Sequence, residues 1–143
     1  MNKKLIIGSD HAGYILKNYL FNYLVDKGFK VYYAGTYSEE SCDYPVIAKE
    51  VADKVANLDY DLGILICGTG VGMSIAANKV KGIRAAVVSD TCSAKLSRQH
   101  NNANILCIGS RIVGESLAKD IVDIWISTDF AGERHQRRVS MIE

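Results

Sequence analysis

This sequence lacks a strong net charge, a long apolar segment and cysteines at the short spacings of metal or redox motifs. Its 143 residues carry a formal net charge of +1, so nothing draws the whole chain to nucleic acid or to an anionic membrane. Apolar runs stay far below the roughly 20 residues of a membrane span, and the apolar stretch at the start of the sequence is too short for a signal peptide. We therefore expect a cytoplasmic protein that binds a small molecule, with no nucleic acid and no membrane as partner.

The four cysteines form no CxxC pair and have no histidine at zinc-ligand spacing. A disulfide framework or a structural metal is therefore not expected, and the sequence points to no cofactor. The single proline, Pro45, stands at the expected start of a helix, where its missing N–H is tolerated. No linker, repeat or low-complexity segment interrupts the chain, which predicts one domain over residues 1–143.

Short segments rich in β-branched residues alternate with longer segments of helical period. The expected strands are residues 4–8, 30–33, 61–67, 83–88 and 104–108, and the expected helices are residues 13–27, 46–56, 73–79, 91–100 and 115–127. In the first helix one apolar stripe should be buried, and it includes Ile15, Leu16 and Leu20. Strands that are apolar on both faces predict a doubly wound α/β sandwich around a five-stranded parallel sheet, followed by a polar C-terminal tail or helix.

The segment from Asp61 to Gly72 carries the strongest chemical signal. A buried strand runs directly into Cys67, and glycines follow at positions 68, 70 and 72. Glycines at this spacing let successive backbone N–H groups converge on an anionic oxygen. The positive end of the next helix would stabilise that anion and a Cys67 thiolate. For either feature alone, the structural alternative is a tight turn after an ordinary core cysteine.

Polar residues also follow the first and fifth expected strands, and ligands of such sheets bind at the carboxyl ends of the strands. Asp10 taken alone could cap the first helix. His11 beside it is placed to bind phosphate or to move protons. Arg111 could join a phosphate site or pair with a carboxylate.

Two more candidate groups lie later in the chain. His100 and Asn101 close the fourth expected helix, where a C-terminal cap is the structural alternative. Arg134 and Arg138 are four residues apart, so a helical tail would present both guanidinium groups on one face, a geometry suited to a phosphate dianion. A solvated tail face is the alternative there.

A dinucleotide-binding fold is the obvious rival, because Gly68-Thr69-Gly70 opens a helix and Asp90 lies about where a ribose-binding acid belongs. The third glycine, however, falls at position 72 rather than 73, and the motif follows the third expected strand instead of the first. Both departures disfavour the rival.

Several segments together resemble one enzyme family in their order and spacing. They are residues 9–13, 43–45, 67–79, 82–85, 96–101, 109–111 and 134–139. Over essentially its whole length the chain is similar to the type B ribose-5-phosphate isomerases of the RpiB/LacAB sugar-phosphate isomerase family. The resemblance implies a three-layer, Rossmann-like α/β/α sandwich and a metal-independent aldose-ketose isomerase that interconverts ribose 5-phosphate and ribulose 5-phosphate in the pentose phosphate pathway. It also implies a homodimer or a dimer of dimers with active sites shared between subunits.

The same resemblance assigns roles to individual residues. Cys67 would be the base that moves a proton between C2 and C1, and His100 would open the furanose ring. The groups that would hold the cis-enediolate are Thr69 and the backbone of Gly68, Gly70, Val71 and Gly72. The residues that would contact the sugar are Asp10, Tyr44 and Asn101. The residues that would surround the phosphate are His11, Arg111, Arg134 and Arg138.

Some relatives use a glutamate six residues after the cysteine, and Met73 at that position places this chain in the cysteine subgroup. Two alternatives stay open. One is an isomerase of a six-carbon aldose 6-phosphate, such as allose or galactose 6-phosphate. The other is a non-catalytic module that binds a sugar phosphate or a nucleotide and in which Cys67 is merely packed.

Overall fold

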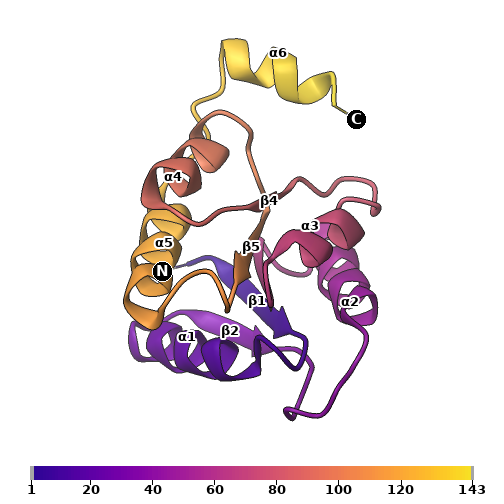
Figure 1. Cartoon of the computed structure of the whole chain (residues 1–143). Helices are drawn as coiled ribbons and strands as arrows, with labels where there is room; N and C mark the ends of the chain where they lie inside the picture. The colour runs from indigo at the N-terminus through magenta and orange to yellow at the C-terminus, as the bar shows by residue number, and fades with distance from the viewer. Residues whose placement is uncertain (1, 143) are drawn as a thin grey trace.

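A computed structural model describes residues 2–142 and contains one five-stranded sheet between two layers of helices (Figure 1). The strands are β1 (Lys4–Ser9), β2 (Lys30–Tyr33), β3 (Leu62–Cys67), β4 (Ala85–Val87) and β5 (Ile105–Gly109). The helices are α1 (Tyr14–Asp26), α2 (Tyr44–Ala56), α3 (Val71–Ala77), α4 (Thr91–Gln99), α5 (Glu115–Ser127) and α6 (Arg134–Ser140). The strands pair in the order β2-β1-β3-β5-β4, and all four pairings are parallel.

This topology confirms the expected doubly wound α/β sandwich, and the polar tail forms the short helix α6. Element boundaries differ from expectation by two residues at the start of α2, at both ends of α3 and at the start of β4. Helix α3 begins at Val71 because Gly70 has a left-handed backbone (φ 82°), which turns the chain directly from the strand end into the helix. Strand β4 begins only at Ala85, since the Arg84 N–H donates to the side chain of Asn104 (2.8 Å).

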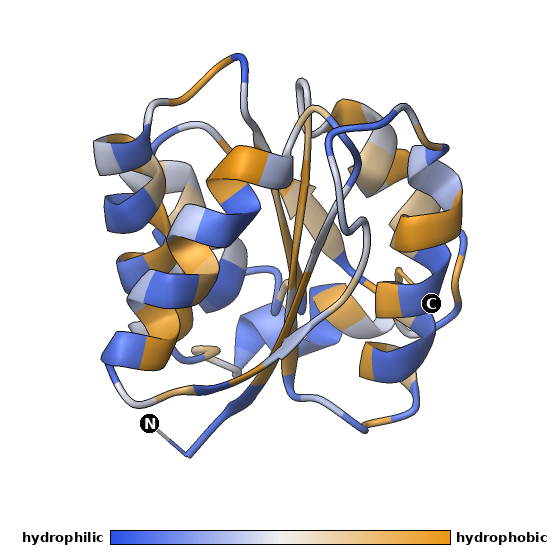
Figure 2. Ribbon diagram, turned by 90° about the horizontal axis from the view of Figure 1, so that it is seen from below, coloured by the Kyte–Doolittle hydropathy of each residue, from blue (hydrophilic) through white to orange (hydrophobic). Residues whose placement is uncertain are grey.

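The apolar residues form a separate core on each face of the sheet. Residues of β1 alternate between them, with Leu5 and Ile7 facing one core and Ile6 facing the other. Trp125 and the buried leucines of α1 belong to the first core, whereas α2 and α3 supply the second. Figure 2 shows the apolar faces of the helices turned inward toward the sheet. No helix within residues 2–142 combines the length and the apolar character needed to cross a membrane.

Helix α1 departs from its expected apolar stripe at two positions. Leu16 and Leu20 are buried as expected, but Ile15 is 63% exposed, so its assignment to the core is wrong. Consecutive helical residues point about 100° apart, and the stripe centred on Leu16 and Leu20 turns Ile15 toward solvent. Lys17, on the other side of Leu16, is fully buried instead.

Gly13 marks a close approach between the start of α1 and the end of β3. A Cβ at this position would lie 2.6 Å from the backbone oxygen of Ile66. Gly114, which precedes α5, has open space around the same position. Both glycines are the N-cap residues of their helices, so they form a matched pair.

We expect Gly13→Ala to lower the free energy of unfolding by about 1 to 3 kcal/mol more than Gly114→Ala does, because only the first methyl group meets backbone atoms. The N-cap preference lost on replacing glycine by alanine is common to both variants and cancels in the difference. Urea unfolding followed by circular dichroism measures both values. Equal losses in the two variants would contradict the proposed steric limit.

Candidate active site

Cys67 is the last residue of β3 and is 5% exposed. Its Sγ accepts a hydrogen bond from the backbone N–H of Gly70 (3.2 Å). This bond fixes the position of the sulfur at the tip of the strand. The left-handed turn at Gly70 makes this bond possible, and a Cβ there would also lie 2.9 Å from Val87.

The glycine loop after Cys67 is fastened to the end of β5. The N–H groups of Ser110 and Arg111 donate to the backbone oxygens of Cys67 (2.8 Å) and Gly68 (2.9 Å). The guanidinium of Arg111 covers Gly68, since a Cβ on that glycine would lie 3.3 Å from Nη1. Arg111 thus contacts the loop through both its backbone N–H and its guanidinium group.

Thr69 and Tyr44 complete the surroundings of this loop. Thr69 is exposed, and its Oγ1 accepts the N–H of Val71 (3.3 Å), so the hydroxyl proton points elsewhere. Tyr44, the first residue of α2, packs on Gly72, where a Cβ would lie 2.7 Å from the aromatic ring. The loop therefore lies between β5 and the start of α2.

Asp10 and His11 reach the same edge from β1. The Asp10 N–H donates to the Ile66 oxygen (3.1 Å), and Oδ1 of Asp10 accepts the N–H of Gly13 (3.1 Å). Gly13, and not Asp10, is the N-cap residue of α1, so the capping role weighed for Asp10 is wrong. The Asp10 carboxylate binds the N–H of that glycine and thereby uses one of its two oxygens. His11 Nδ1 accepts the N–H of Cys42 (3.2 Å), which leaves Nε2 as the nitrogen that carries the proton.

These residues form one group, which we call the carboxyl-edge cluster. Its members are Asp10, His11, Tyr44, Cys67, Gly68, Thr69, Gly70, Val71, Gly72 and Arg111. Beside it lies an open cleft of about 600 Å³ lined by His11, Ile15, Arg111 and Glu115. The exposed Ile15 of α1 thus contributes an apolar wall to this cleft.

The remaining candidates lie at the opposite edge of the sheet. His100 caps the C-terminus of α4, and its ring stacks on that of His135 in α6, with centroids 4.3 Å apart and planes 10° apart. The segment before α6 is tied there by the Ala131 N–H, which donates to the Gln99 oxygen (3.0 Å). We call His100, Asn101, Arg134 and Arg138 the amino-edge cluster. Figure 1 shows α6 beside the end of α4, at the margin of the molecule.

Positive charge is concentrated around α6. Partial burial, with the nearby charges of His100, Arg134 and Arg138, lowers the pKa of His135. Arg134 and Arg138 are both exposed. A group of this kind is suited to bind an anion such as a phosphate ester.

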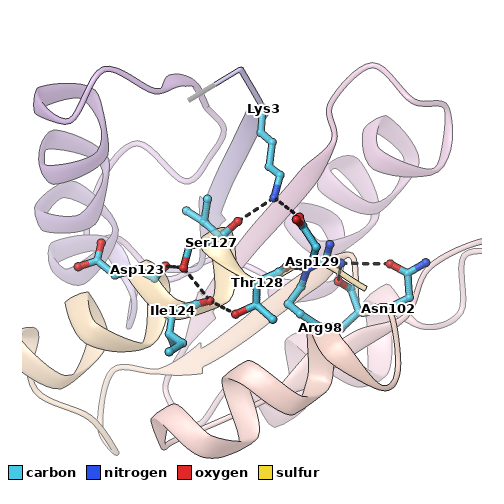
Figure 3. A network of polar contacts seen from close by, with 10 residues as sticks. Lys3, Arg98, Asn102, Asp123, Ile124, Ser127, Thr128 and Asp129 are labelled. Carbon is cyan, nitrogen blue, oxygen red and sulfur yellow. Dashed lines mark hydrogen bonds and ion pairs between the residues drawn. The ribbon is translucent and has the colours of Figure 1, made fainter. Parts of the chain in front are cut away.

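Arg98 holds the turn that carries His100 and Asn101 (Figure 3). Its Nη1 donates to Asn102 Oδ1 (3.2 Å) and to the Ala103 oxygen (2.5 Å), while Nε donates to the Thr128 oxygen (3.2 Å). One buried guanidinium therefore connects the end of α4 to the segment after α5.

The two clusters do not meet within one chain. Cys67 pairs with Gly109 at the end of β5, whereas His100 and Asn101 precede the start of the same strand. From Ile105 to Gly109, β5 is about 13 Å long at about 3.3 Å per residue. A ligand in contact with both Cys67 and His100 must therefore receive one of them from a second chain.

Comparison with known proteins identifies the family. A family profile described as Ribose/Galactose Isomerase matches residues 5–142. The chain belongs to this family. Ribose-5-phosphate isomerase B of Escherichia coli K12 is 55% identical over 140 residues, which make up 98% of this chain and 94% of that protein.

Two solved structures of the family are close to this one. The ribose 5-phosphate isomerase of Thermotoga maritima superposes with a TM-score of 0.97 at 51% identity and covers 99% of this chain and 98% of its own. Ribose-5-phosphate isomerase B of Mycoplasma genitalium was solved with bound ribulose-5-phosphate. It superposes with a TM-score of 0.94 at 50% identity and covers 99% of this chain and 95% of its own.

Sequence reasoning missed three residues that support the clusters: Lys17, Arg98 and His135. No pattern marked Lys17 or Arg98 as buried, because lysine and arginine on a helix are usually exposed. His135 could have been found from its place between Arg134 and Arg138, but its partner His100 is 35 positions away and becomes its neighbour only in the fold.

We expect iodoacetamide to distinguish the cysteines of the native protein. Burial, with a smaller contribution from Cys67, raises the pKa of the Cys107 thiol far above its usual range, so this residue should stay unlabelled at pH 8 until the protein is unfolded. Cys67, with an N–H donor on its sulfur, should react at least about tenfold faster than Cys107. Peptide mass spectrometry reports both, with the exposed Cys92 as the positive control. Equal protection of Cys67 and Cys107 would contradict this ranking.

Proposed function

We propose that this protein is an aldose-ketose isomerase that interconverts ribose 5-phosphate and ribulose 5-phosphate through a cis-enediolate, with Cys67 as the base. The observation that carries the proposal is the Cys67 sulfur, fixed by the Gly70 N–H at the tip of β3. The backbone oxygen of Cys67 accepts the N–H of Ser110, which lines the same cleft as His11 and Arg111. The family match, and the ribulose-5-phosphate bound to the Mycoplasma genitalium relative, support this substrate over a nucleotide.

In this mechanism the Cys67 thiolate removes the proton from C2 of the open-chain aldose. The electron pair of the broken C–H bond forms the C1–C2 double bond, and the carbonyl oxygen on C1 takes up the negative charge. Return of the proton from sulfur to C1, with transfer of the hydroxyl proton from O2 to O1, gives the ketose. No atom is gained or lost, and the thiolate is regenerated.

The developing charge on O1 requires hydrogen-bond donors already in place. The glycine loop provides the Thr69 hydroxyl and the backbone N–H groups other than those of Gly70 and Val71, which already bind Cys67 Sγ and Thr69 Oγ1. Contacts to β5 and Tyr44 hold the loop in place. A well-placed donor of this kind is typically worth about 3 to 4 kcal/mol in the transition state. Met73, fully buried in the second core, has no group that could act as the base in place of Cys67.

Phosphate binding would be divided between the clusters. His11, with a proton on Nε2, and Arg111 would bind from the carboxyl edge, and Arg134 and Arg138 would bind from the α6 of a second subunit.

The sugar itself would be contacted by Asp10, through its second carboxylate oxygen, and by Asn101. His100 would open the furanose by moving a proton from the O1 hydroxyl toward the ring oxygen.

A second copy of this chain is proposed as the partner, and the face that it covers is apolar. Val71 and Ile75 on α3 and Val87 on the edge strand β4 are 47%, 59% and 44% exposed. Val87 lies against Gly70, so whatever covers this face also lies beside Cys67. An exposed edge strand flanked by apolar side chains favours association. A homodimer accounts for the observations, and a dimer of dimers is the larger form that the family allows.

Three narrower expectations stay predictions: one domain over residues 1–143, a cytoplasmic location, and activity without a metal or another cofactor. Among the described residues 2–142, no group of three or more His, Cys, Asp or Glu side chains is arranged to hold a metal ion.

The first test of function is the Cys67→Ala variant. We expect it to lower kcat for ribose 5-phosphate at least about 100-fold, because the base is lost, and to leave the dissociation constant within about threefold of wild type. Formation of ribulose 5-phosphate and calorimetric binding measure the two quantities. Cys92→Ala, at an exposed position of α4, is the control and should keep full activity. A Cys67→Ala enzyme with more than about a tenth of the wild-type kcat would refute the role.

The same assay includes allose 6-phosphate and galactose 6-phosphate in place of ribose 5-phosphate. Faster turnover of either hexose phosphate would move the assignment to a six-carbon substrate. If wild type binds all three sugars and isomerises none, the protein is a binding module.

The shared site predicts complementation between two defective variants. Mixing Cys67→Ala with Arg134→Ala/Arg138→Ala and allowing the subunits to exchange should restore about a quarter of the wild-type activity at low substrate concentration. The reason is that about half of the dimers are mixed and each mixed dimer has one intact site of two. Native mass spectrometry confirms the exchange. Exchange without recovered activity would place the arginines and the cysteine of one site in the same chain.

A further inference from the structure

Lys17 is a fully buried lysine that the proposed chemistry does not use. Its Nζ donates to the backbone oxygens of Ala34 (2.9 Å) and Thr36. Around the same ammonium lie three aromatic rings, with Nζ 4.1 Å from the centroid of Tyr33, 5.5 Å from Tyr14 and 5.8 Å from Tyr37. Carbonyl oxygens and ring faces together replace the water that the charge has lost.

The two carbonyl groups belong to the segment of residues 34–43, which we call the 34–43 loop. At its start, the Ser9 N–H donates to the Gly35 oxygen (2.8 Å) and the Thr36 N–H donates to the Ser9 oxygen (2.7 Å). Ser9 immediately precedes Asp10 and His11. The beginning of the loop therefore sets the backbone from which two site residues emerge.

The far end of the loop reaches the site directly. The Cys42 N–H donates to His11 Nδ1 (3.2 Å), which fixes both the orientation of the ring and the nitrogen that carries the proton. Two residues later Tyr44 packs on Gly72 of the glycine loop. Between these ends, residues 37–41 are exposed, so apolar burial contributes little to holding them.

We propose that Lys17 is a positioning residue for phosphate binding: its ammonium holds the start of the 34–43 loop so that the Cys42 N–H keeps His11 in its binding orientation. This inference rests on the isomerase function proposed above. A methionine of similar length would fill the same space without desolvating a charge, so core packing alone gives no reason for a lysine here. The two backbone carbonyl groups of the loop give that reason.

The charge of Lys17 depends on pH within the working range of an enzyme. Burial lowers its pKa to about 8, against opposing contributions from Cys42 and Glu50. The groups that face the ammonium are Tyr14 on its own helix, Tyr33 on β2, Tyr37 and Cys42 on the loop, and Glu50 on α2. Above pH 8 the amine becomes neutral and its bonds to the two carbonyl groups weaken.

Above about pH 8, deprotonation of Lys17 affects loop position and folding stability in opposite directions. The folded pKa lies below the ordinary value of 10.5, so between about pH 8 and 10.5 the unfolded chain binds more protons at this residue than the folded chain does. The contribution of Lys17 to stability therefore rises with pH while its hold on the loop is lost. Weaker phosphate binding above pH 8 would not reflect unfolding caused by this group.

Lys17→Met tests the proposal, and Lys49→Met, at an exposed lysine paired with Asp53 on α2, is the control. We expect Lys17→Met to raise both the KM for ribose 5-phosphate and the calorimetric dissociation constant for inorganic phosphate about tenfold, with kcat changed less than about threefold. In a His11→Asn background the effect of Lys17→Met should shrink to about threefold or less, because the two residues act through one contact. Lys49→Met should match wild type in every measurement.

A folded Lys17→Met protein with unchanged phosphate affinity overturns the proposal. So does a Lys17→Met effect on the dissociation constant that is equally large in the wild-type and His11→Asn backgrounds. If Lys17→Met does not fold, the wild-type dissociation constant for inorganic phosphate is measured from pH 7 to 9.5. A rise centred near pH 8 supports the proposal, and a flat profile overturns it. Phosphate binding needs no turnover, so a wild type that binds phosphate but isomerises nothing would refute the proposed function and still decide the role of Lys17.

Discussion

All five strands run in the same direction, and this one constraint determines where chemistry can occur. Parallel strands deliver their last residues to one edge of the sheet, so Asp10, Cys67 and Arg111 come together although they are far apart in the sequence. Helices that return the chain must end at the opposite edge, and α4 therefore leaves His100 on the wrong side for its own Cys67. The direction of the strands thus separates His100 from Cys67 of the same chain, before any side chain is considered.

Glycines are required at the carboxyl edge of the sheet, because neighbouring segments lie closer to their Cα atoms than a Cβ would permit. Atoms of Ile66 and Thr69 lie 2.6 Å from the Cβ positions of Gly13 and Gly109, and the Tyr44 ring lies 2.7 Å from that of Gly72. These approaches press β1, β5 and α2 onto the turn after Cys67. The Gly70 N–H then points at sulfur because the turn has no freedom to relax.

The sequence alone predicted the alternation of strands and helices and the Cys67 turn, because apolar periodicity and glycine spacing are local signals. It could not predict features that depend on partners distant in the chain. The burial of Lys17 needs the carbonyl groups of the 34–43 loop, and the exposure of Ile15 follows from which side of α1 meets the sheet. For His100, the residue was identified, but its position opposite Cys67 and its stacking on His135 required the strand order and the path of α6.

The proposed division of the site between two chains would couple substrate binding to association of the subunits. In the proposed arrangement, a sugar phosphate held by Arg111 of one chain and by Arg134 and Arg138 of another would bind the dimer and not the separated chains, and so would stabilise the dimer by mass action. A concentration 100 times the dissociation constant contributes about 2.7 kcal/mol per site. Helix α6 stacks His135 on His100 and buries Val139 against its own chain, whereas Arg134 and Arg138 stay exposed. In that arrangement, the interaction that recognises the phosphate would also help to hold the two chains together.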